Sequence, residues 1–148
     1  MVKNIISKEY EKDFYAWAIY NAKLLREGKF SNVDIEHVAE EIESMGKSEK
    51  RELVNRLAVL MAHLLKWKYQ PEKRTKSWTL TIKNQRIQLS DLLEESPSLK
   101  KELEEKFHHA YERAKVLAAK QTRLEEDEFP KHPPFSFKDC LKSSFLPD

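Results

Sequence analysis

The sequence predicts an all-α protein, a single-domain helical bundle of five main helices plus a short C-terminal helix. The chain has only 2 Gly against 35% charged residues, too little Gly for many tight hairpins. Its apolar residues recur at steps of three and four, which is the helical spacing. Residues 48–70 are apolar on more than one side, which is typical of a helix that others surround. This third helix is therefore predicted to be central.

The length and the cysteine content limit the class of protein. A chain of 148 residues fits one domain over residues 1–148, with residues 1–7 and 125–135 irregular. The single cysteine, Cys140, cannot form an internal disulfide and favours a reducing compartment. No apolar run approaches the ~20 residues of a membrane span, and the N-terminus lacks the apolar core of a secretory signal. We expect a cytoplasmic protein with no membrane contact and no cofactor.

The first helix is predicted from about Lys8 to Glu27. Ser7 is a plausible N-cap, and Gly28 supplies the stop. Steps of three and four along this segment mark an inner face, which consists of Tyr10, Phe14, Trp17, Asn21, Leu24 and Leu25.

The second helix is predicted after a short link, with Ser31 or Asn32 as its cap and Gly46 at its end. Its inner stripe consists of Ile35, Val38, Ala39, Ile42 and Met45. Its outer face is acidic and consists of Asp34, Glu36, Glu40, Glu41 and Glu43. No Lys or Arg occurs from residue 31 to 45. A face of this kind is typical of a solvated surface or of a docking surface for basic partners.

The third helix is predicted to start at Ser48 and to end before Pro71, because the residue preceding a proline is disfavoured in the α region. A polar, basic link, residues 71–76, leads to a fourth helix from about Ser77 to Glu95. Its stripe consists of Trp78, Ile82, Leu89, Leu92 and Leu93. Several β-branched residues in its first turns leave a short strand open as an alternative.

The fifth helix is predicted from Ser96 as cap, with Pro97 at the first helical position, to about Arg123. An acidic, Pro-rich segment follows, and a short last helix is predicted over residues 136–143, capped by Ser136. The tail is too apolar to be free, so we expect it to dock on the bundle through Phe135, Phe137, Leu141, Phe145 and Leu146.

Three stretches carry a family resemblance. They are YEKDFYAWAIYNAKLLREGKF near the start, EEIESMGKSEKRELVNRLAVLMAHLLKWKYQPEKRTKSW in the middle, and FPKHPPFSFKDCLKSSFLPD at the end. With them the chain resembles a bacterial family known as domain of unknown function number 29. The nearest matches are Glu41-Ile42-Glu43, Gly46, Glu49, His63 to Trp67, Gln70-Pro71, Trp78 and Arg86. The resemblance implies a compact all-helical bacterial protein and supplies no activity.

Cations and aromatic rings are concentrated in the middle of the chain. Residues 47–86 contain 11 Lys and Arg against three Glu, a net charge of +8, whereas the rest of the chain carries −6. The candidate binding residues are Lys66, Lys68, Tyr69, Lys73, Arg74, Lys76 and Arg86. Cations along phosphates and rings under bases are how proteins hold single-stranded nucleic acid. The alternative is that Trp67 and Trp78 pack against each other or the core and that the cations form a solvated rim.

For the link at the start of the fourth helix, Arg74→Ala and Lys76→Ala are expected to leave the fold intact, because the link should be exposed. Trp67→Ala should cost about 3–5 kcal/mol if the ring is part of the core.

Glu41 and His63 are the candidate polar cluster. An imidazole paired with a carboxylate can act as a general base. No helix presents Glu-x-x-His into an apolar stripe, since Glu105 and His108 flank Phe107 rather than share its face, so no metal site and no catalytic residue is assigned.

These observations favour a small cytosolic interaction module that acts through complementary charged and aromatic surfaces, on a protein partner or on itself. One alternative is nucleic-acid binding through residues 66–86. Another is a metal- or acid/base-dependent enzyme that uses His63 with acidic residues of the second helix.

Overall fold

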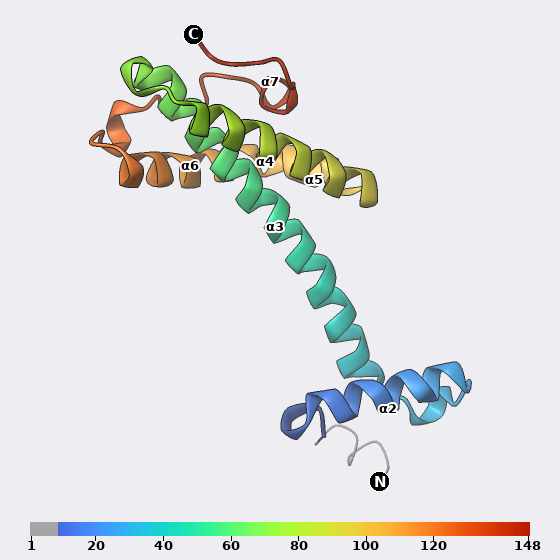
Figure 1. Cartoon of the computed structure of the whole chain (residues 1–148). Coiled ribbons are helices and arrows are strands. Elements are labelled where there is room, and N and C mark those ends of the chain that lie inside the picture. Colours follow the sequence, from blue (N-terminus) through green and yellow to red (C-terminus); the bar gives the residue numbers. More distant parts are fainter. Residues whose placement is uncertain (1–8) are drawn as a thin grey trace. The chain divides into compact units, whose positions relative to one another are not determined.

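The computed structural model describes residues 9–148, and these residues form helices and connecting turns with no strand (Figure 1). The elements are α2 (Phe14–Arg26), η1 (Phe30–Asn32), α3 (Ile35–Tyr69), η2 (Pro71–Lys73), α4 (Lys76–Glu95), α5 (Leu99–Glu105), α6 (Phe107–Gln121), η3 (Glu126–Glu128) and α7 (Phe137–Leu141), where η marks a 3₁₀ turn. The all-α prediction is confirmed, and within the described residues the alternative of a strand at the start of α4 is wrong.

The chain groups into two compact units, residues 1–48 and residues 49–148. The described part of the first unit holds α2, η1 and the first turns of α3, and buries a small cluster of Trp17, Leu24 and Val33. The second unit holds the rest of α3 and every later helix, and buries a much larger cluster. That residues 1–148 form a single domain stays a prediction.

In the first unit the predicted first helix is interrupted at Asp13. Residues 9–12 are helical, and α2 begins afresh at Phe14. Asp13 leaves the helical region (φ −145°, ψ 82°), and its side chain accepts the backbone N–H of Ala16 at 3.0 Å. A short carboxylate satisfies an orphan N–H here, which is why Asp starts a helix more readily than it continues one. Ser7 and Lys8 lie outside the described residues.

The end of α2 confirms the prediction from Gly28. Gly28 has φ +72°, a conformation that glycine adopts without a Cβ clash. The N–H of Lys29 donates to the carbonyl of Leu24 (2.9 Å), and the N–H of Gly28 donates to that of Leu25 (3.2 Å). These two bonds form a Schellman motif, which satisfies carbonyls that the helix end leaves free.

The predicted second and third helices are one continuous helix, α3, of 35 residues. Gly46 does not end a helix and Ser48 does not cap one, and both predictions are wrong. Gly28 is the only described glycine with positive φ, so Gly46 stays in the ordinary helical region. A helical glycine costs about 1 kcal/mol relative to alanine but removes no hydrogen bond, and no proline stands nearby to break the chain. The actual start, at Ile35, follows Asp34, whose carbonyl accepts from the N–H of Val38 (2.9 Å).

The two glycines give a paired prediction. Gly46→Ala should raise the free energy of unfolding by about 0.5–1 kcal/mol, since a Cβ there meets nothing within 4 Å. Gly28→Ala should lower it by about 1 kcal/mol, because an L side chain is strained at φ +72°. Denaturant unfolding followed by circular dichroism measures both. A loss of stability in Gly46→Ala would contradict a continuous α3.

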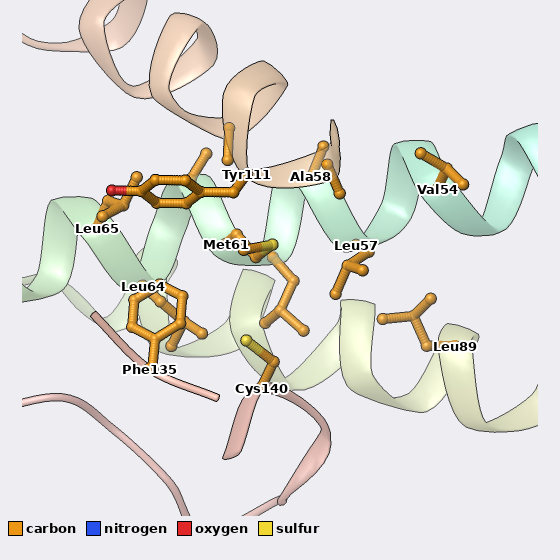
Figure 2. Packing of buried hydrophobic residues seen from close by; sticks show 14 of the residues in the cluster. Val54, Leu57, Ala58, Met61, Leu64, Leu65, Leu89, Tyr111, Phe135 and Cys140 are labelled. Carbon is orange, nitrogen blue, oxygen red and sulfur yellow. The ribbon is translucent and has the colours of Figure 1, made fainter. Parts of the chain in front are cut away.

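The second unit packs around α3, as predicted. The apolar run from Leu53 to Leu65 faces α4 on one side and α6 on another, and the C-terminal segment closes the cluster (Figures 1 and 2). The large, fully buried side chains from α3 are Leu53, Leu57, Leu60, Met61, Leu64 and Leu65. The helix ends at Tyr69, directly before Gln70-Pro71. Thr75 caps α4 by accepting the N–H of Trp78 at 3.2 Å, so Lys76 belongs to the helix and not to the link.

The predicted fifth helix is two helices, α5 and α6. Lys106 leaves the helical region (φ −92°, ψ 8°), and its N–H is shared between the carbonyls of Glu102 and Leu103. The start also differs, because Ser98 precedes the first helical residue and Pro97 lies in a turn. Apolar residues keep the same spacing across Lys106, so periodicity alone cannot locate the break.

The tail docks on the second unit, as predicted. Ser136 caps α7 by accepting the N–H of Asp139 (3.0 Å), although the helix ends at Leu141 rather than at Ser143. The hydroxyl of Tyr111 donates to the carbonyl of Pro130 (2.6 Å) and ties the preceding loop to α6. The side chains that pack on the cluster are Phe129, Phe135, Phe137, Cys140, Leu141 and Phe145. Leu146 is 40% exposed and is the one predicted docking residue that does not join them.

Candidate functional site

Lys66, the first residue of the predicted basic-aromatic surface, is buried inside the second unit. Its Nζ donates to Oε1 of Gln121 (2.8 Å) and lies 4.9 Å from the ring centroid of Trp78. Burial lowers the pKa of the Lys66 amine, because the charged form loses hydration. The cation therefore joins α3 to α6 and α4 within the fold.

Arg74 also interacts with another residue of the second unit, Trp67. Its Nε donates to the carbonyl of Trp67 (2.8 Å), and its guanidinium lies 4.7 Å from the centroid of the Trp67 ring. Trp67 is half-buried and packs beneath this cation. The expectation that the link is exposed is therefore wrong for Arg74.

Lys76→Ala and Arg74→Ala should now differ in stability. Arg74→Ala should lower the free energy of unfolding by about 1–2 kcal/mol, because it removes a charge-assisted hydrogen bond and a cation–π contact. Lys76 is exposed in the first turn of α4, and its replacement should change stability by less than about 0.5 kcal/mol. Chemical denaturation of both variants provides the comparison, and equal losses would contradict the Arg74–Trp67 contact.

Tyr69 and Lys68 lie at the end of α3. The Tyr69 ring packs edge-on against Phe129 with centroids 5.6 Å apart, and burial raises the pKa of its hydroxyl. Lys68 Nζ lies 5.9 Å from the Tyr69 centroid. Lys73 is exposed.

Arg86 is a second buried candidate cation, with 8% of its surface exposed. Its Nε donates to the carbonyl of Cys140 (2.8 Å), and Nη1 lies 3.4 Å from the carbonyl of Ser143. Burial lowers the pKa of the Arg86 guanidinium. Arg86 thus anchors the end of α7 to α4 by binding carbonyls that a helix end leaves free.

Glu41 and His63 have different partners. Glu41 accepts a hydrogen bond from the hydroxyl of Tyr10 (2.5 Å), in the first unit. His63 is half-buried in the second, with Nδ1 3.0 Å from the carbonyl of Val59, and burial lowers its pKa. Acid–base catalysis by His63 and nucleic-acid binding through residues 66–86 stay predictions.

The first unit contains a buried polar network that the sequence did not reveal. Asp34 Oδ2 accepts from Nε1 of Trp17 (2.9 Å) and lies 2.7 Å from Nδ1 of His37. The backbone N–H of Asp34 donates to Oδ1 of Asn21 (2.9 Å). Burial alone would raise the pKa of Asp34, but the hydrogen bonds from His37 and Trp17 outweigh it and lower the pKa. Tyr10 stacks on His37 with centroids 4.0 Å apart.

One signal for this network was present in the sequence. Asn21 is a polar residue on the otherwise apolar stripe of α2, and it is buried. A buried amide needs a hydrogen-bond partner, and the N–H of Asp34 provides one. The prediction that Asp34 belongs to a solvated acidic face is wrong, because Asp34 is buried.

Most of the apolar side chains predicted to face inward from the second helix are exposed to solvent in the first turns of α3. Ile35 is 57% and Ile42 60% exposed, and Ala39 and Met45 are exposed as well. Asp34 and His37 face Trp17 of α2 instead, and His37 and Glu41 contact Tyr10 in the helical residues 9–12. Buried hydrogen bonds and ring contacts, rather than aliphatic packing, decide which face of α3 turns inward here.

These features define an all-α protein with internal polar networks in both units. Within residues 9–148, no three His, Cys, Asp or Glu side chains are grouped so as to hold a metal ion, and no helix is long and apolar enough to cross a membrane. A family model described as domain of unknown function DUF29 matches residues 9–146, and the chain belongs to this family. No curated protein and no solved structure matches this chain.

Proposed function

We propose that the protein is a cytoplasmic interaction module that binds a helix of a protein partner along Ile35, Ala39 and Ile42 of α3, here called the α3 strip. The observation that carries the proposal is the exposure of large apolar side chains on the first unit. Those exposed within residues 9–48 are Phe14, Tyr15, Ile19, Tyr20, Leu25, Phe30, Ile35, Ile42 and Met45. Among them, Ile35 and Ile42 share one face of α3, and a continuous exposed apolar strip on a helix is typical of an interaction surface.

The spacing of the α3 strip suits a helical partner. Ile35, Ala39 and Ile42 follow steps of four and three, which is the pattern of a seam between two helices. Gly46 continues the pattern, and the space around it is open to 4 Å. A glycine at that point lets a partner helix approach closely.

Charge distinguishes the kind of partner. Glu36, Glu40 and Glu43 are exposed and border the α3 strip on one side, and residues 31–45 contain no Lys or Arg. A second copy of the chain would bring carboxylates against carboxylates, which disfavours self-association through this strip. A partner helix whose apolar face is bordered by Lys or Arg fits both the shape and the charge.

A pair of synthetic helical peptides tests the proposal. Both carry leucines at steps of three and four, one bordered by lysines and the other by glutamates. We expect the lysine peptide to bind the full chain at least tenfold more tightly than the glutamate peptide in a fluorescence-anisotropy titration. Ile42→Glu should weaken that binding at least tenfold, since burial of an Ile side chain contributes about 1.5–3 kcal/mol.

The matched control is Leu80→Glu, on α4, where the side chain is 53% exposed. It should leave binding unchanged. Equal affinity for the two peptides, or equal loss in both variants, would contradict the proposal. A dimer seen by light scattering and abolished by Ile42→Glu would assign the strip to self-association instead.

A further inference from the structure

Arg86 carries a positive charge into the second unit, and its hydrogen-bond partners are all neutral. Nε and Nη1 meet the carbonyls of Cys140 and Ser143. Nη2 is buried and has no hydrogen-bond partner within residues 9–148. A guanidinium offers five N–H donors, and a buried donor without an acceptor is unfavourable. The Arg86 guanidinium therefore has N–H donors without an acceptor, and no carboxylate of the described residues pairs with its positive charge.

A pocket of about 380 Å³ lies against this side chain. That volume falls within the range of small-ligand sites, roughly 300–1,000 Å³. The lining residues are Lys83, Arg86, Ile87, Ser90, Asp91, Leu141 and Ser143.

The pocket lining carries positive charge at one end and negative charge at the other, and both ends are formed by residues of α4. Lys83 and Arg86 supply positive charge, and Ser90 and Asp91 supply a hydroxyl and a carboxylate further along the same helix. At 1.5 Å per residue, Arg86 and Asp91 are separated by about 7.5 Å along the axis. Ile87 comes between them in the sequence and adds apolar surface to the lining. A simple anion would meet the Asp91 carboxylate without compensation, so the lining favours a ligand that carries both charges.

We propose that this pocket binds a small organic carboxylate that also carries an amino group several bonds away. The carboxylate of the ligand pairs with Lys83 and supplies the counter-charge that Arg86 lacks. The ammonium group pairs with Asp91.

The test uses the full chain with γ-aminobutyrate and ε-aminocaproate as probes, and butyrate and butylamine as singly charged analogues, at constant ionic strength. Amide chemical shifts report binding. We expect the amino acids to shift amides of α4 and of residues 140–143, with the singly charged analogues binding at least tenfold more weakly. Lys83→Met and Asp91→Asn should each weaken binding at least tenfold.

Lys83 and Asp91 are both exposed, so these variants should fold normally, which their thermal unfolding checks. Lys100→Met replaces an exposed lysine on α5 outside the pocket and should leave binding unchanged. Arg86 stays in place because it holds the tail. Unchanged spectra up to tens of millimolar probe would overturn the proposal. So would butyrate binding as well as γ-aminobutyrate, or unaltered binding in Lys83→Met and Asp91→Asn.

Discussion

Replacing Leu64 by alanine is expected to lower the free energy of unfolding of the second unit by about 3–5 kcal/mol. The Leu64 side chain is 0% exposed and belongs to the large cluster. Figure 2 shows it in the same buried cluster as Phe135 of the C-terminal segment. The surrounding residues come from several helices and the docked tail, so they cannot all move to fill the space that the shortened side chain leaves. The destabilisation therefore includes both lost burial and a residual cavity.

Denaturant unfolding monitored by circular dichroism measures this loss. Leu80→Ala, which truncates an exposed leucine of α4, is the matched control and should change stability by less than about 0.5 kcal/mol. A loss below 1 kcal/mol in Leu64→Ala would mean that the packing around α3 is not the core of this unit.

Replacing Asp34 by alanine should lower the stability of the first unit by about 2–4 kcal/mol, the cost of leaving buried polar groups unsatisfied. The substitution removes the acceptor of the Trp17 indole N–H and the partner of His37, and it leaves the indole N–H buried without an acceptor. Hydrogen exchange of residues 9–48 measures the effect where it occurs. Glu36→Ala, two residues further on and exposed, should leave exchange unchanged.

The same substitution should change the response to acid. The pKa of Asp34 in the folded protein lies below the ordinary value of 3.8. Its contribution to stability is therefore fully present above that value and is lost as pH falls through the lower, folded pKa. The Asp34→Ala variant should lose less stability than the parent protein on acidification below about pH 4. Parallel stability curves for the two proteins would rule out this role for the Asp34 carboxylate.

Local chemistry made several helix ends predictable from the sequence. Gly28 ends α2 because glycine adopts positive φ, Pro71 fixes the end of α3, and the hydroxyl of Ser136 caps α7. The core of the second unit was equally predictable, since the run from Leu53 to Leu65 has too much apolar surface to lie anywhere else.

Other features depend on partners that are distant in sequence. Gly46 resembles a stop, yet the hydrogen bonds of α3 continue through it. Lys106 interrupts a segment whose apolar spacing is unbroken. The outward rotation of Ile35 and Ile42 follows from the contacts of Asp34 and His37 with Trp17 of α2, which no periodicity encodes.

The candidate site differed most from its prediction for the same reason. Lysine and arginine in a basic segment are normally solvated. Composition cannot show that Lys66 donates a hydrogen bond to Gln121, or that Arg86 donates one to the carbonyl of Cys140. The two pairings join residues 55 and 54 positions apart in the sequence. Lys73 and Lys76, which have no such partners nearby in the fold's interior, are exposed as expected.

Because Cys140 of the C-terminal segment is buried, its reaction with a thiol reagent can report how this segment opens. It is the only cysteine, its side chain is fully buried, and burial raises the pKa of its thiol to about 12. At neutral pH almost none of the thiol is ionised, and the thiolate is the form that reacts. Alkylation of the Cys140 thiol therefore requires the C-terminal segment to separate from the core. At reagent concentrations where alkylation is faster than reclosing, the rate of labelling at this one sulfur gives the opening rate of the C-terminal segment without an introduced cysteine.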